Sequence, residues 1–307
     1  MTTDPFTRSL TGSARQPVVT LTRRYPQDRA AVWAAVTDPP RLARWLGDVE
    51  SDAADPARYL IRLPDATAAT DAVVDARVVS CDPLARLVLD WSGVPGETSR
   101  VTVSLRADGD GDGDGTILTL EHRLSAPDRP AVDGVGWEER LAALVALLGG
   151  ERGATSLEAW SSMAGRPLEV VVDLPRCAAD VWPFLVTPEG LRAWWWNHWD
   201  DVEISADARP GGLYRFAAPA AGIVVEGTYL AVEPASHLSF TWHWIDEDGA
   251  SSDEACDLHL ADTADGCRLT VRHTGPWPDD AAATGYRQGW EFVLAALLTA
   301  VRSGGAQ

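Results

Sequence analysis

Lysine is absent from this sequence. All 26 basic side chains among the 307 residues are arginines, and 45 acidic residues bring the formal net charge to −19. Without lysine the chain has neither a Schiff-base nucleophile nor the lysine that holds phosphates in a P-loop. An acidic surface repels phosphate backbones and anionic lipid headgroups, so neither nucleic acid nor a membrane is an expected partner.

Long apolar runs and paired cysteines are also lacking. No stretch approaches the roughly 20 apolar residues of a membrane span, and the first 16 residues do not resemble a signal peptide. The four cysteines form no Cys-x-x-Cys pair and are interpreted as reduced core residues of a cytoplasmic chain. Motifs of zinc hydrolases, serine esterases and dinucleotide-binding proteins are missing, and no cofactor is expected.

The sequence does contain an internal repeat. Val32-Trp33 returns 149 residues later as Val181-Trp182, and Gly136-Trp137-Glu138 returns 153 residues later as Gly289-Trp290-Glu291. Because the order of the motifs is kept and their offset drifts by only four residues, the chain is predicted to hold two copies of one domain.

The repeat sets the expected domain boundaries. Residues 1–16 are expected to form a disordered tail, 17–150 a first and more divergent domain, 151–166 a linker and 167–303 a second domain. The linker is assigned because it mixes glycine, serine and charged residues, although Leu157, Trp160 and Met163 could form one docked helical turn.

Each copy shows the same predicted elements. A strand leads into a short helix that a proline breaks, and five alternating segments then predict an antiparallel sheet. A long helix follows, and in the second copy its apolar residues lie at i, i+3, i+4, i+7 and i+8 from Trp290. The alternating segments are 59–63, 73–79, 87–91, 101–105 and 117–122 in the first copy, and 213–216, 224–232, 238–244, 255–260 and 268–273 in the second. The predicted fold class is α+β, with two tandem domains in which a curved antiparallel sheet is wrapped around a long C-terminal helix.

Motifs of the second copy resemble a known family. They include Pro210-Gly211-Gly212-Leu213-Tyr214-Arg215-Phe216, Gly227-Thr228-Tyr229-Leu230, a Val-Trp helix and a late Gly-Trp helix. This pattern resembles the activator of Hsp-90 ATPase homologue family of the START-like, or SRPBCC, superfamily. The resemblance implies a helix-grip fold with a hydrophobic cavity between sheet and last helix, which the superfamily uses to bind lipids, polyketides and other apolar molecules.

Aromatic residues are the main candidates for lining such a cavity. Fourteen tryptophans are many for a chain of this length, and an apolar cavity with N–H donors is what they could form. Filling the core is the alternative role for each ring. The predicted ligand-binding residues are Trp194, Trp195, Trp199, Arg215, Tyr229, Trp242, Trp244, His273 and Trp290 in the second copy, and Trp45, Trp91 and His122 in the first.

The two histidines and the arginine of this set have simpler interpretations too. His122 and His273 occupy equivalent positions, each in phase with apolar residues of its predicted strand, which favours buried histidines with satisfied hydrogen bonds over catalytic ones. Arg215 is expected to form a salt bridge with Glu226.

One acidic loop fits a metal-binding pattern. Asp110, Asp112, Asp114 and Glu121 match the spacing of an EF-hand calcium loop. Its flanks favour strands where an EF-hand requires helices, so a solvated hairpin turn is the preferred interpretation and no metal is expected.

Three functions remain open. The first is a non-catalytic or stress-associated protein, monomeric or homodimeric, that binds an apolar small molecule. The second is a didomain enzyme similar to polyketide aromatase/cyclases, which requires Arg215 with Tyr214 or Tyr229 inside the cavity. Since Tyr214 and Arg215 are adjacent on a strand, they cannot both point inward. The third is a surface that binds a chaperone.

Overall fold

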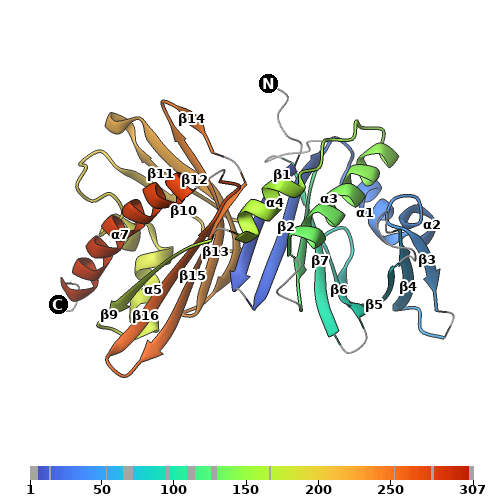
Figure 1. Ribbon diagram of the computed structural model, residues 1–307, viewed down its shortest axis with the longest axis horizontal. Coiled ribbons are helices and arrows are strands. Elements are labelled where there is room, and N and C mark those ends of the chain that lie inside the picture. The colour runs from blue at the N-terminus through green and yellow to red at the C-terminus, as the bar shows by residue number, and fades with distance from the viewer. Residues whose placement is uncertain are drawn as a thin grey trace. The chain divides into compact units, whose positions relative to one another are not determined.

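The computed structural model describes residues 6–13, 15–52, 54–64, 72–94, 97–108, 115–125, 130–165, 167–251, 253–277 and 280–303. It divides into two compact units, one made of Met1–Arg8 and Ser13–Trp160, the other of Ser9–Gly12 and Ser161–Gln307. Two antiparallel sheets are present, each followed by helices, as Figure 1 shows. The predicted tandem α+β fold is therefore confirmed.

The first sheet has eight strands in the order β1-β2-β8-β7-β6-β5-β4-β3. All of its predicted alternating segments form strands, each of them longer than expected. The elements are β1 (Phe6–Ser13), β2 (Gln16–Tyr25), α1 (Arg29–Thr37), α2 (Pro39–Leu42), β3 (Asp48–Ser51), β4 (Arg58–Leu63), β5 (Ala72–Asp82), β6 (Arg86–Val94), β7 (Glu97–Ala107), β8 (Thr116–Arg123) and α3 (Pro130–Leu147).

The second sheet has the order β10-β11-β12-β13-β15-β16-β9, with β14 paired to β13. A short helix lies between the copies, where a linker was expected. The elements are α4 (Leu157–Gly165), β9 (Leu168–Leu174), α5 (Ala178–Val186), α6 (Pro188–Arg192), β10 (Glu203–Ala206), β11 (Leu213–Ala218), η1 (Pro219–Ala221), β12 (Ile223–Glu233), β13 (His237–Asp246), β14 (Gly249–Ala250), β15 (Glu254–Thr263), β16 (Gly266–Thr274) and α7 (Asp280–Ser303).

The helix α7 packs on its sheet through the apolar stripe that the sequence predicts. Trp290, Val293, Leu294, Leu297 and Val301 are buried and join one core cluster with residues of the sheet and of α5. Figure 1 shows α7 lying along the sheet of its own unit. Among the described residues, no helix combines the length and hydropathy needed to cross a membrane.

The expectation of a disordered tail over residues 1–16 is wrong for Phe6–Ser13, which forms β1. Composition misled here because Arg8, Ser9 and Thr11 of this polar segment are buried. Arg8, only 3% exposed, forms an ion pair with the fully buried Glu138 of α3. The Nε of Arg8 donates to Oε2 of Glu138 at 3.0 Å, and the Nε1 of Trp160 donates to the same oxygen at 2.9 Å.

We expect Arg8→Met to destabilise the first unit by about 3 kcal/mol or more, because it leaves the Glu138 carboxylate buried without its ion-pair partner. Urea unfolding followed by circular dichroism measures the change. The matched control is Arg62→Met, which removes an exposed ion pair with Glu50 and should cost less than about 1 kcal/mol. Equal losses in the two variants would contradict the role assigned to Glu138.

Candidate functional site

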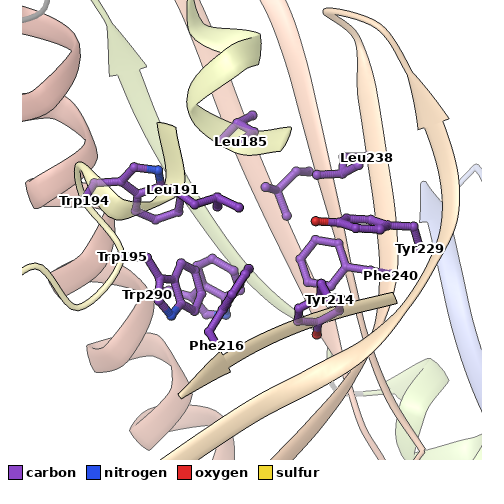
Figure 2. Close-up of a pocket in the computed structure, with 11 residues that line it drawn as sticks. Leu185, Leu191, Trp194, Trp195, Tyr214, Phe216, Tyr229, Leu238, Phe240 and Trp290 are labelled. Atoms are coloured by element: carbon purple, nitrogen blue, oxygen red, sulfur yellow. The ribbon is translucent and has the colours of Figure 1, made fainter. Parts of the chain in front are cut away.

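The aromatic core of the second unit is filled by its own side chains. Figure 2 shows rings from the sheet facing Trp195 and Trp290, with Trp194 and Leu191 beside them. The hollow among them measures about 20 Å³, room for about one water molecule. Tyr214, Phe216, Tyr229 and Phe240 are buried here. The predicted site residues Trp194 and Tyr229 therefore belong to the packed core.

A larger cavity lies next to this core, between β13 and α7. Its volume is about 300 Å³, at the lower end of the range of small-molecule pockets. Trp195 and Trp290 contribute to both spaces. The cavity is lined by Trp195, Trp196, Trp242, Trp244, Ala282, Gly285, Tyr286, Gly289, Trp290 and Val293.

Two glycines on α7 keep the cavity open. Gly285 and Gly289 are one helical turn apart, so they share a face of the helix, and both line the cavity. A Cβ atom at either position would meet no neighbouring heavy atom within 4 Å. A glycine inside a helix costs about 1 kcal/mol relative to alanine. The helix thus carries two unfavourable residues at the positions where side chains would fill the cavity.

The cavity wall also includes a residue with an unusual backbone conformation. Trp196 has a φ of +50°, in the left-handed region that a non-glycine residue adopts at a cost in energy. Its ring packs edge-on against Trp244 and Trp199, with ring centroids 6.0 and 5.7 Å away. Trp199 is partly buried and supports Trp196 from outside the cavity lining.

Few polar atoms border the cavity. The indole Nε1 of Trp195 is buried and has no hydrogen-bond partner among the described residues. An unmet buried donor costs about 1–3 kcal/mol, so a ligand with a hydrogen-bond acceptor would gain from meeting it. Tyr286 supplies the hydroxyl of the lining, and burial together with the Glu254 carboxylate raises the pKa of this hydroxyl.

Behind Tyr286 lies a buried acid–base pair. The Nδ1 of His273 accepts a hydrogen bond from Nε1 of Trp290 at 3.2 Å, so the ring proton of a neutral His273 sits on Nε2. This Nε2 is 3.4 Å from a carboxylate oxygen of Glu254. The other oxygen of Glu254 accepts from Nε1 of Trp277 at 3.2 Å. The ring of Tyr286 packs on His273, with 4.6 Å between centroids.

The first copy has the same histidine without the acid. The Nδ1 of His122 accepts from Nε1 of Trp137 at 3.0 Å, and its Nε2 lies 2.8 Å from Oγ of Ser99. Ser99 pairs with Trp91 across its sheet as Glu254 pairs with Trp242. A neutral hydroxyl therefore stands in the first copy where the second has a carboxylate.

Two predicted tryptophans have a structural role that repeats between the copies. The Nε1 of Trp45 donates to the carbonyl oxygen of Ala35 at 2.9 Å, and the Nε1 of Trp194 donates to that of Phe184 at 2.8 Å. Each bond ties the residues after the second short helix to the first short helix. The repetition indicates that the fold requires these bonds.

Arg215 lies away from the cavity. Its side chain is exposed and within 4 Å of Glu226 and Glu203, whereas the adjacent Tyr214 is buried and donates to the carbonyl oxygen of Thr241 at 2.8 Å. The strand alternation expected for Tyr214 and Arg215 is thus present, and it directs Arg215 outward.

The acidic loop can be placed only in part. Asp110, Asp112 and Asp114 lie outside the described residues, and Glu121 lies in β8.

Of the predicted set, the structure brings Trp195, Trp242, Trp244 and Trp290 together at the cavity, with His273 one layer behind. Sequence reasoning missed Glu254, Gly285, Tyr286 and Gly289. Two signals could have found some of them. Paired glycines inside an otherwise continuous helix pattern require an explanation, and matching the strands of the copies sets Glu254 against Ser99.

One protein family matches both copies of the repeat. The model described as activator of Hsp90 ATPase homolog 1-like protein matches residues 27–149 and 177–302, which together exceed half of the chain. The chain belongs to this family.

Solved structures include proteins similar to this activator of Hsp90 ATPase homolog 1-like chain. CalU16 from Micromonospora echinospora is 24% identical, with a TM-score of 0.37, over 48% of this chain and 86% of CalU16. MLL2253 from Mesorhizobium loti is 23% identical, with a TM-score of 0.40, over 45% of this chain and 98% of its own. DynU16, a protein of the dynemicin biosynthetic locus, is 20% identical, with a TM-score of 0.35, over 92% of this chain and 97% of its own. No curated protein matches the chain.

The buried His122 of the first copy should make the folded chain less stable in acid. Burial lowers the pKa of His122 to about 4, against 6.5 for a free histidine. Between these pH values the unfolded chain binds more protons than the folded chain, so stability is lost as the pH falls from about 6.5 to about 4. The loss attributable to His122 reaches about 3 kcal/mol.

Urea unfolding of the wild type and of His122→Gln at pH 7 and pH 4.5 measures this loss. The variant should be less stable at pH 7 but lose less stability on acidification. The control is His243→Gln, which removes an exposed histidine of the second unit and leaves His122 in place. If His122→Gln and the wild type lose equal stability, His122 is not the group that titrates.

Proposed function

We propose that the second domain binds an apolar, ring-containing small molecule in the cavity between β13 and α7. The observation that carries this proposal is a tryptophan-lined space of about 300 Å³ that two helix glycines leave unfilled. A dry apolar cavity of about 150 Å³ holds one benzene molecule. Twice that volume suits a ligand with two or three fused rings.

The lining favours flat aromatic ligands over flexible chains. The rings of Trp242 and Trp290 are 5.5 Å apart and tilted by 42°, and Trp195 meets Trp242 at 6.0 Å, edge-on. Such surfaces offer faces and edges to a further ring, and each aromatic contact of this kind adds about 0.5–1.5 kcal/mol beyond the area buried.

The negative charge near the cavity disfavours anionic ligands. The carboxylate of Glu254 lies behind Tyr286, and the whole chain carries a net charge of −19. A ligand with its own carboxylate, such as a fatty acid, would be repelled. A neutral molecule with a carbonyl or hydroxyl group can instead meet the N–H of Trp195 and the hydroxyl of Tyr286.

Catalysis is a second candidate, and one observation favours it. Glu254 and His273 form a buried acid–base pair one layer behind Tyr286, which is the kind of arrangement that moves protons in enzymes. The arginine of the aromatase/cyclase-like alternative is not available for it, because Arg215 is on the exposed face. Mass spectrometry of bound polyketide-like ligands, incubated with the wild type and with Glu254→Gln, would separate turnover from binding.

Filling the cavity from the helix tests the binding proposal. Quenching of tryptophan fluorescence is titrated with flavonoids, aromatic polyketides and fatty acids, and we expect saturable quenching by the neutral ring compounds. Gly289→Leu should weaken their binding tenfold or more, because its side chain enters the cavity. Its thermal midpoint should stay equal or rise, since leucine is favoured over glycine in a helix by up to about 0.8 kcal/mol.

The matched control is Gln288→Leu, an exposed position on the same helix that does not line the cavity. This variant should bind as the wild type does. Wild-type affinity in Gly289→Leu, or no response of the wild type to any ring compound, would contradict the proposal and leave the chaperone-binding surface as the alternative.

A further inference from the structure

We propose that His237, Asp257 and His259 form a binding site for one divalent transition-metal ion in the second unit. The three side chains lie on β13 and β15, on the face of the sheet opposite the cavity. Leu238 and Phe240 on β13 point into the core, so His237 points to the other face. On β15 the same alternation separates Asp257 and His259 from the buried Leu258.

The strand register brings the three groups together. His237 and His259 are direct cross-strand partners, and Asp257 pairs with Ser239 one step along the same face. One candidate ligand atom from each of the three residues lies within 4.8 Å of the others. The Nε2 of His237 is 2.9 Å from Oδ1 of Asp257. Asp257 and His259 are two residues apart on β15, and the pairing of β13 with β15 brings His237 to them.

The electrostatics of the cluster leave a place for a cation. Asp257 is a carboxylate with only 1% exposure, and burying such a charge is costly unless positive charge lies close by. Its Oδ2 accepts a hydrogen bond from the backbone N–H of Gly12 at 2.9 Å, which fixes the carboxylate. Glu233 adds a second negative charge 4.0 Å from Nδ1 of His237. Arg272 supplies a positive charge near Asp257. The Nη1 of its guanidinium donates a hydrogen bond to the carbonyl oxygen of Gly12.

The unpaired nitrogen of His259 is the most direct sign of an open ligand position. This Nε2 is buried and has no hydrogen-bond partner within the described part of the chain. An imidazole nitrogen that carries no proton and makes no hydrogen bond is able to bind a metal ion. Two imidazole nitrogens and one carboxylate, with water as the fourth ligand, are a set that zinc(II) uses.

The rings have to rearrange when the ion enters. They are stacked in parallel, with 4.3 Å between centroids and 6° between planes. Because an imidazole nitrogen binds a metal in the plane of its ring, two stacked rings cannot both hold one ion as they stand. The ring of His259 is the one to turn about its Cβ–Cγ bond, since its Nε2 has no hydrogen bond to lose.

The first copy shows that the fold does not require this cluster. Equivalent positions follow from the strand registers, in which Arg86 pairs with Ser104 and Val88 with Thr102. Arg86 and Ser104 thus stand where the second copy has His237 and His259, and Thr102 stands in place of Asp257. A sheet of the same topology folds with no metal ligand at these positions, so the three ligand residues are a feature of the second copy alone.

Titration with cobalt(II) and zinc(II) tests the site. The full chain, freed of metal with a chelator, is titrated with cobalt(II), whose visible absorption reports its coordination, and zinc(II) is then added in competition. We expect one equivalent to bind and zinc(II) to displace it. His259→Gln and His237→Gln should each weaken binding about tenfold or more, with folding checked by circular dichroism.

The control is His243→Gln, since His243 is exposed on the same strand and should contribute nothing. Asp257→Asn keeps the side-chain shape and should also weaken binding. Unchanged affinity in Asp257→Asn would reduce the site to a histidine pair and overturn the proposal. No binding by the wild type, or equal loss in His243→Gln and His259→Gln, would overturn it as well.

Discussion

A hydrogen bond between a tryptophan of the last helix and a histidine of the last strand recurs in both copies, and the architecture depends on it. Trp137 donates to His122 in the first copy, and Trp290 donates to His273 in the second. In each copy the bond links the last helix to its sheet. It also fixes the histidine tautomer, because the nitrogen that accepts from the indole cannot carry the proton of a neutral ring. The other nitrogen must then face a polar partner.

The identity of that partner separates the two copies. Ser99 satisfies the first histidine with a neutral hydroxyl, and Glu254 gives the second a carboxylate in the same strand position. The indole bonds of Trp45 and Trp194 repeat without change, as contacts that the fold requires would do. Comparing the two copies within the chain therefore separates two kinds of feature. Features shared by the copies maintain the helix-grip fold, and features found in the second alone mark the candidate sites.

The sequence predicted what depends on local pattern and on repetition. Strand alternation predicted the sheets, and the apolar stripe that begins at Trp290 predicted the long helix. Both patterns, with periods of 2 and 3.6 residues, are visible within a short segment. Prediction from the sequence failed where the interacting residues are far apart in the chain. Arg8 appeared to belong to a polar tail, since Glu138 lies 130 residues away. The pairing of His237 with His259 was missed because it requires the strand register. The cavity depends on Gly285 and Gly289, whose meaning appears only once the opposing rings are in place.

The ion pair between β1 and α3 also bears on when the first unit completes its fold during synthesis. Arg8 leaves the ribosome early, but Glu138 follows 130 residues later, and Trp160 later still. At about 5–20 residues per second this interval is on the order of 10 s. During this interval Arg8 of β1 cannot form its final ion pair, because Glu138 has not yet been synthesised. Closure of the first unit thus awaits the end of its own sequence, while the strands between β2 and β8 can already pair.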